Sequence, residues 1–258
     1  MIQRMLAGAL FAGCAAGLLA ALLHFAFVQN VLLLAEEYES GTLVHFQGAQ
    51  GGDGHSHDHA ATGETAAEAD QPSGAGAAET GHDHAATDGE GASPVKRNAL
   101  TVMFFMLTYT GYAMVLVAGL ALAAQMGITV GAAEGVLWGI AGFVTFQFAP
   151  AMGLAPELPG TVAADLGERQ VWWWSTVVCT GAGLALLAYG RTLLTALAAG
   201  ALLAAPHVIG APELDQFFGT APPELAAKFA ARVLGAALVT WAFMGWICAK
   251  LWSGKAAA

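Results

Sequence analysis

The sequence predicts an all-α polytopic membrane protein, a bundle of six transmembrane helices with a long disordered first loop. Of its 258 residues, 57% are hydrophobic and only 11% are charged, which is far from the composition of a soluble domain. Six apolar runs are present, and a helix needs roughly 20 apolar residues to cross a bilayer. The segment between the first two runs has almost no aliphatic or aromatic side chains, so it cannot belong to the bundle.

The first apolar run, Met5–Ala35, is predicted to be an uncleaved span, with residues 1–38 forming this helix and its exit. The run is too long for the core of a signal peptide, which has roughly 7–15 residues. Ala9, Gly13 and Gly17 recur at four-residue spacing, a pattern typical of close helix packing in membranes. We therefore expect this face to contact another helix.

Residues 39–98 are predicted to be a disordered acidic loop, because they cannot bury enough apolar surface to offset the entropy lost on ordering. Twelve of the nineteen acidic residues lie between Glu36 and Glu90, so the net charge of −10 belongs mainly to this region. The loop repeats the sequence His-Asp-His-Ala-Ala-Thr. Its clustered histidines are His55, His57, His59, His82 and His84.

Closely spaced histidines in a flexible chain predict weak binding of a divalent transition metal. Neutral imidazole suits zinc, copper, nickel and cobalt, whereas calcium and magnesium prefer oxygen ligands. Asp58 and Asp83 add carboxylate oxygens next to the imidazoles. Two clusters in one loop favour metal binding over a solvated linker with incidental histidines. The pattern does not choose among cobalt, nickel and zinc, because affinities at such sites follow the general divalent order.

Residues 99–258 are predicted to form the five-helix membrane region. Its apolar runs are about Ala99–Ala124, Ala132–Ala149, Val171–Ala188, Leu193–Val208 and Ala226–Leu251. Gly131, Gly135 and Gly139 form a second face of small residues at four-residue spacing. Six spans leave both termini on one side, and we place them in the cytoplasm because the opposite orientation gives the His-rich loop no capture role.

A repeated motif, Ala-Pro-x5-Pro-Glu-Leu, closes two of these runs. The copies are Ala149–Leu158 and Ala205–Leu214. Proline disfavours helix in the preceding residue and removes a backbone donor, so both runs should end in irregular backbone. Corresponding interrupted helices are typical of binding sites in transporters built from repeats. We expect three helical hairpins, the second and third related by this repeat.

The first, third and fifth spans end on the same face of the membrane as the loop, which brings several ligand-type side chains together there. Ionisable groups near or within a span are costly and are functional candidates by default. The predicted metal-receiving residues are His24, Glu36, Glu37, Glu157, His207 and Glu213. For each histidine alone the alternative is a neutral imidazole bonded to a backbone carbonyl, and for Glu157 and Glu213 it is a solvated charge at a helix end.

Several function classes are disfavoured by the composition. The chain has no basic patch for nucleic acid, and no nucleotide-binding loop of the Gly-x-x-x-x-Gly-Lys-Ser/Thr kind. Cys14, Cys179 and Cys248 lie in apolar runs, as packing residues do. No nucleophile and base are grouped in the spans, so we expect neither an enzyme nor a cofactor other than the metal itself as substrate.

The chain resembles the CbtA family of probable cobalt transporter subunits. The resemblance covers nearly the whole chain and is carried by Gln29, by Glu36-Glu37-Tyr38-Glu39, by Pro-Glu-Leu-Pro-Gly at Pro156–Gly160 and by Ala211–Glu213. It implies a multi-pass protein of the bacterial cytoplasmic membrane that carries cobalt, related to cobalamin. It also implies a small single-span partner subunit with its own His-rich segment.

The sequence thus predicts a transporter subunit in the lipid bilayer, whose loop histidines collect a divalent ion for the carboxylates and histidines at the helix ends. The main alternative is a membrane-anchored metal buffer or accessory protein that transports nothing itself. An exporter with a cytoplasmic loop and a structural membrane protein without a metal phenotype are two further alternatives.

Overall fold

The computed structural model describes residues 2–45, 93–216 and 218–253. The chain divides into a helical unit, Met1–His45 with Asn98–Ala258, and the segment Phe46–Arg97. The described residues of the helical unit confirm the all-α fold class. They contain a single isolated β-bridge, Thr161 to Gly219. Most of the loop that is predicted to be disordered, with its five clustered histidines, lies outside the described residues.

The described helices, in chain order, are α1 (Ile2–Leu23), η1 (His24–Val28), α2 (Gln29–Glu39), α3 (Pro94–Gln125), α4 (Ala132–Phe143), η2 (Val144–Phe148), α5 (Ala149–Ala151), α6 (Leu166–Tyr189), α7 (Leu193–Ile209) and α8 (Pro223–Ser253). The segments η1 and η2 are π-helical turns inside longer helices. Two continuous helices therefore run from α1 through α2 and from α4 through α5.

Five of the six predicted spans are long and apolar enough to cross a membrane, within the described ranges. They are Met5–Glu39, Pro94–Gln125, Ala132–Ala151, Leu166–Tyr189 and Pro223–Ser253. The remaining predicted span, α7, is apolar but has 17 residues, which gives it a length of about 25 Å at 1.5 Å per residue. That is shorter than a hydrocarbon core of roughly 30 Å, so α7 differs from the other five.

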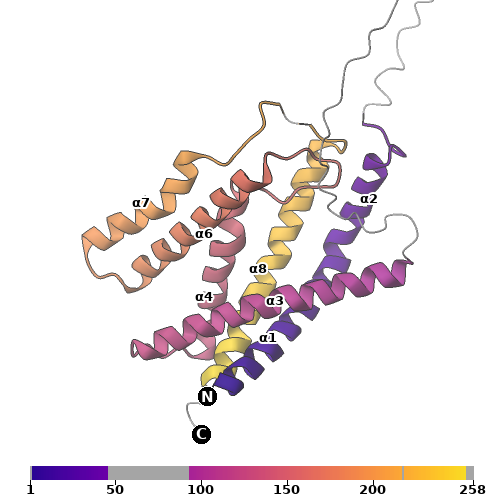
Figure 1. Cartoon of the computed structure of the whole chain (residues 1–258). Coiled ribbons are helices and arrows are strands. Elements are labelled where there is room, and N and C mark those ends of the chain that lie inside the picture. The colour runs from indigo at the N-terminus through magenta and orange to yellow at the C-terminus, as the bar shows by residue number, and fades with distance from the viewer. Residues whose placement is uncertain (1, 46–92, 217, 254–258) are drawn as a thin grey trace, which may run out of the picture. The chain divides into compact units, whose positions relative to one another are not determined.

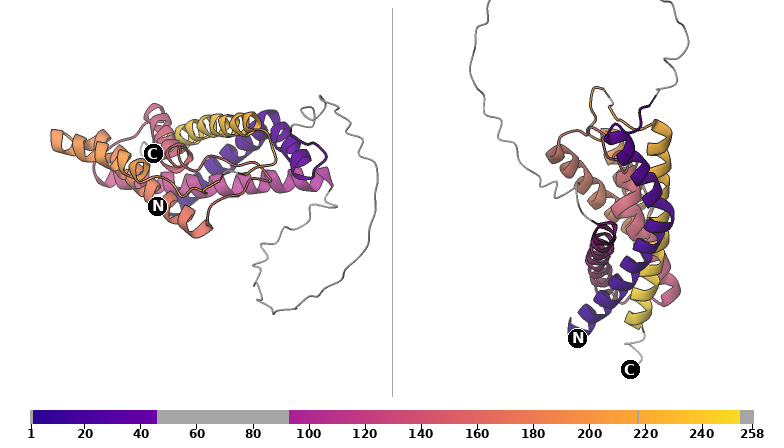
Figure 2. Two further views of the ribbon diagram at one scale, coloured as in Figure 1. Left: turned by 90° about the horizontal axis from the view of Figure 1, so that it is seen from above. Right: turned by 90° about the vertical axis from the view of Figure 1, so that its right-hand side faces the viewer.

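The helix α8 packs along both α4 and α1 (Figures 1 and 2). On α4, Gly135 and Gly139 lie directly against the backbone of Trp241 and Gly245 in α8. A Cβ atom on any of these three glycines would meet backbone atoms of the opposite helix. The predicted face of small residues is confirmed for Gly135 and Gly139, whereas Gly131 caps the start of α4.

The small-residue face of α1 packs against α3. A Cβ atom added to Gly13 would meet the backbone of Thr110, and one added to Gly17 would meet the backbone of Met106. Ala9 is buried in the same core. The predicted contact face of the first span is therefore confirmed.

The helices α6 and α7 pack side by side (Figure 1). Gly183 of α6 lies against Leu203 and the backbone of Ala199 in α7. The expected pairing of α7 with α8 is therefore wrong, whereas α6 contacts both α7 and the continuous helix from α4 to α5. The physical reason is the fit of glycine surfaces, because α4 presents its glycines to α8 and leaves α6 to pair with α7.

The ends of α2 and α5, the segment after α7 and the start of α8 meet at one end of the bundle, here called the motif end. Leu158 is buried there with Val31 and Ala35 of α2 and Phe229 of α8. Gly160 has φ +76°, which favours glycine, and its α-carbon faces Glu39 and Thr220. The predicted shared face of the first, third and fifth helices is thus present.

The motif prolines lie inside the last turn of their helices rather than at the end. Pro150 is the second residue of α5, and Pro206 lies three residues before the end of α7. Proline is tolerated at α5 because the π turn before it has already shifted the hydrogen bonds, with the Ala149 N–H donating to Val144 O. Irregular backbone follows both helices, as predicted.

We predict that Gly139→Ala lowers the free energy of unfolding in detergent by about 1–3 kcal/mol, because the new methyl group overpacks the α4–α8 contact. Thermal or denaturant unfolding followed by circular dichroism measures the change. Gly200→Ala in α7 is the matched control, since its Cβ would meet open space. Equal stability of the two variants would show that the glycine contact does not hold the bundle together.

Candidate functional site

Two hollows lie at the motif end of the bundle. The Glu157 hollow, of about 470 Å³, is lined by the end of α4–α5, the segment after it, the start of α6 and part of α8. The His207 hollow, of about 310 Å³, is lined by Met152, Gly153, Trp172, His207, Gly210, Ala211 and Glu213. Both are open to the surface of the bundle.

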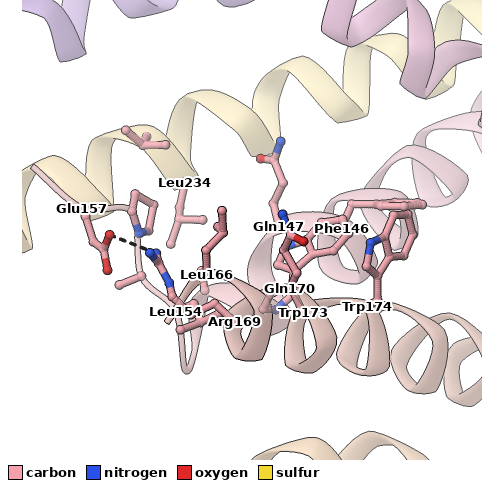
Figure 3. Close-up of a pocket in the computed structure, with 15 residues that line it drawn as sticks. Phe146, Gln147, Leu154, Glu157, Leu166, Arg169, Gln170, Trp173, Trp174 and Leu234 are labelled. Carbon is pink, nitrogen blue, oxygen red and sulfur yellow. Dashed lines mark hydrogen bonds and ion pairs between the residues drawn. The ribbon is translucent and has the colours of Figure 1, made fainter. Parts of the chain in front are cut away.

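The Glu157 hollow contains an ion pair. Arg169 Nη2 donates to Glu157 Oε2 at 3.0 Å (Figure 3). Arg169 comes from the first turn of α6, which starts earlier than predicted because Asp165 caps it by accepting from the Gly167 and Glu168 N–H groups. The pairing compensates the negative charge of Glu157. Gln147 and Gln170 add uncharged polar groups to the same hollow.

The two copies of the repeated motif meet at the His207 hollow. Gly153 of the first copy is packed so closely to Ala211 of the second that an added Cβ would meet the Ala211 methyl group at 2.7 Å. Trp172 fixes this arrangement from α6, since its Nε1–H donates to Pro206 O at 3.1 Å. The indole of Trp172 is 7% exposed and is packed between the two copies.

The His207 hollow presents three different ligand types to solvent. His207 is exposed in the last turn of α7, with its ring 6.2 Å from that of Trp172. Gly210, at φ +88°, ends α7 and turns the chain so that exposed Glu213 lines the same hollow. Met152 is 67% exposed and adds a thioether. An imidazole, a carboxylate and a thioether together suit a borderline transition metal.

The structure does not bring all the predicted metal residues together. Glu36 is half-buried and Glu37 exposed near the end of α2. His24 begins η1, twelve residues before Glu36, a separation of about 18 Å along a helix, and its ring contacts Phe25 and Phe105. Among the described residues, no three His, Cys, Asp or Glu side chains are grouped to hold a metal ion. The six-residue receiving group stays a prediction, and only His207 and Glu213 share a hollow.

Sequence reasoning missed a polar group inside the bundle. Gln147, in the π turn η2, lies within hydrogen-bonding reach of the Tyr109 and Tyr112 hydroxyl groups. Thr240 of α8 also reaches Tyr109. The available signal was Gln147 itself, an amide in the middle of an apolar run, because polar residues at membrane depth are costly.

Residues 2–253 match the family described as probable cobalt transporter subunit (CbtA). The chain belongs to the CbtA family. No curated protein and no solved structure matches it. Membership makes this CbtA protein a probable cobalt transporter subunit. Its five long apolar helices make it a multi-pass membrane protein, and the word subunit indicates that it acts with a partner.

We predict that Trp172→Phe lowers the free energy of unfolding by roughly 1 kcal/mol, because it removes the buried hydrogen bond to Pro206 O. Trp174→Phe is the control, since Trp174 is 59% exposed and its replacement should leave stability nearly unchanged. Denaturant unfolding of both purified variants in the same detergent makes the comparison. A loss no larger for Trp172→Phe than for Trp174→Phe would contradict the proposed role of the indole.

Proposed function

We propose that this CbtA protein carries divalent cobalt through the membrane and receives the ion in the His207 hollow. The observation that supports the proposal is the grouping of Met152, His207 and Glu213 in one open hollow built from both motif copies. Imidazole nitrogen, carboxylate oxygen and thioether sulfur form a mixed donor set that suits Co²⁺ better than Ca²⁺ or Mg²⁺. Nickel and zinc share this chemistry and are its natural competitors.

The exposure of the three donors favours brief rather than tight binding. A transported ion must be bound well enough to enter and weakly enough to leave. Three protein ligands leave positions for water, so the ion sheds its hydration shell in stages. Glu36 and Glu37 add negative charge at the motif end of α2, and Glu157 joins the receiving group when its ion pair with Arg169 opens.

The His-rich loop is proposed to collect the ion before it reaches the bundle. We propose that His55, His57, His59, His82 and His84 hold the ion weakly and exchange it rapidly. The loop joins α2 to α3, and α2 ends at the motif end. The loop is proposed to lie outside a bacterial cytoplasmic membrane, with the termini inside and a single-span His-rich partner alongside.

The membrane potential supplies enough free energy for import. An inside-negative potential favours entry of a cation by about 2.3 kcal/mol per charge per 100 mV, and thus by about twice that for a divalent ion. A coupled ATPase is therefore not required by the energetics.

We predict that His207→Ala and Glu213→Gln each reduce initial cobalt uptake by about tenfold or more, because the first removes an imidazole donor from the hollow and the second replaces a charged carboxylate there with a neutral amide. Uptake of radioactive cobalt by cells expressing equal amounts of each variant gives the rates. Glu224→Gln is the matched control, because Glu224 is an exposed carboxylate in the first turn of α8. Wild-type uptake by both site variants would overturn the receiving role of the hollow.

The alternative of a metal buffer makes a different prediction for deletion of residues 51–92. A transporter lacking the loop histidines keeps uptake at high external cobalt and loses it at low cobalt, because the bundle still conducts. A buffer loses its whole metal phenotype at every concentration. Uptake measured across a range of cobalt concentrations separates these outcomes, with surface labelling used to match expression.

A further inference from the structure

A third hollow opens toward the opposite end of the bundle. This Glu134 hollow, of about 490 Å³, lies among α3, α4 and α6. The lining residues that matter here are Tyr112, Glu134, Ala141, Thr145, Phe146 and Trp241. Glu134 is in the first turn of α4, whereas the Glu157 hollow is reached from the end of α5. The two hollows therefore approach each other from opposite ends of one helix.

Phe146 is the residue that lines both the Glu157 hollow and the Glu134 hollow. Gln147, the next residue, lines the first of them, and Thr145, the preceding residue, lines the second. Figure 3 shows Phe146 and Gln147 lining the Glu157 hollow away from the Glu157–Arg169 ion pair. A side chain at this position separates the two spaces.

Aromatic rings surround the Phe146 ring. It stacks on Trp241 with the ring centroids 5.8 Å apart and the planes at 11°. Tyr112 contacts it at 5.5 Å and Trp173 at 6.4 Å. A constriction closed by apolar rings excludes water and stops ions by dewetting.

Polar groups lie next to this aromatic closure. The side chain of Gln147 is within hydrogen-bonding reach of the hydroxyl group of Tyr109 and of that of Tyr112. The indole N–H of Trp241 is buried and has no hydrogen-bond partner in the described part of the chain. Oxygen atoms at this depth offer an ion the partners that it loses when its water shell is stripped.

The backbone at Phe146 is itself irregular. Phe146 is the central residue of the π turn η2, and π turns inside α-helices occur frequently at functional sites. A π turn contains one more residue than the matching α-helical turn, so its return to α-helix would rotate the side chains around it. Such a rotation would change the position of Phe146, which lies at the centre of the turn.

We propose that Phe146 is the gate between two half-channels, one from the Glu157 hollow and one from the Glu134 hollow. The proposal rests on the proposed transport function and specifies its path. The ion leaves the His207 hollow for the neighbouring Glu157 hollow, passes the oxygen atoms of Gln147 and Tyr112 as Phe146 swings aside, and leaves beside Glu134. Alternating exposure of the two hollows is the behaviour expected of a transporter.

Cysteine labelling from the two sides of the membrane tests the gate. In a chain whose natural Cys14, Cys179 and Cys248 are replaced by alanine, single Ala141→Cys and Ala151→Cys variants lie five residues on either side of Phe146. A small membrane-impermeant cationic thiol reagent is applied to right-side-out and to inverted vesicles. We expect Ala151→Cys to react from one side only and Ala141→Cys from the other side only.

Opening the gate should abolish this sidedness. Adding Phe146→Ala to either reporter should allow labelling from both sides, whereas Phe148→Ala, a matched change in the same π turn that lines neither hollow, should not. Phe146→Leu serves if the alanine variant fails to insert. Reporters that react from the same side or not at all, or sidedness that survives both Phe146 variants, overturn the proposal. Because no cobalt is used, this outcome is separate from loss of uptake in His207→Ala.

Discussion

Close backbone packing between α4 and α8 is the constraint on which the rest of the structure depends. Gly135, Gly139 and Gly245 allow the two helices to approach until backbone faces backbone, which is how membrane helices associate where burial of apolar surface from water is no longer a driving force. Once α4 is held by α8, α6 is left to pair with α7. The loop carrying the first motif copy is then placed beside the second copy.

The two π turns also lie against α8. In η1, the Phe27 carbonyl accepts a 2.7 Å hydrogen bond from Arg232 Nη1 of α8, so a side chain satisfies a backbone group at the irregular turn. The second turn, η2, carries Phe146 between two hollows. The long helix α8 therefore packs against both irregular turns, but the two turns differ in how they are held. The first is tied to α8 by a cation, and the second is the one that we propose moves.

The fold class and the helix positions were predicted correctly, because the length of an apolar run and the spacing of small residues can be read directly from the order of residues in the chain. The sequence did not predict helix pairing, which depends on which glycine surfaces fit each other in space. The π turns were also missed, because a one-residue shift of the backbone hydrogen bonds leaves no distinct pattern in the sequence. At the site, His207 and Glu213 were predicted from the repeated motif. Met152 was not predicted, because a methionine in an apolar run cannot be told from a packing residue by sequence alone. Phe146 was not predicted either, because its place between the two hollows is visible only in the structure.

The central claim is that this CbtA protein transports cobalt rather than storing it. The most direct test is uptake of radioactive cobalt by cells that express the full chain together with its partner subunit, compared with cells that express the partner alone, under an imposed and then a collapsed membrane potential. The account predicts uptake that requires this chain, falls when the potential is collapsed and is reduced by excess nickel or zinc. Cobalt that binds to the cells in proportion to the amount of protein, independently of the potential, would contradict transport and support the metal-buffer alternative.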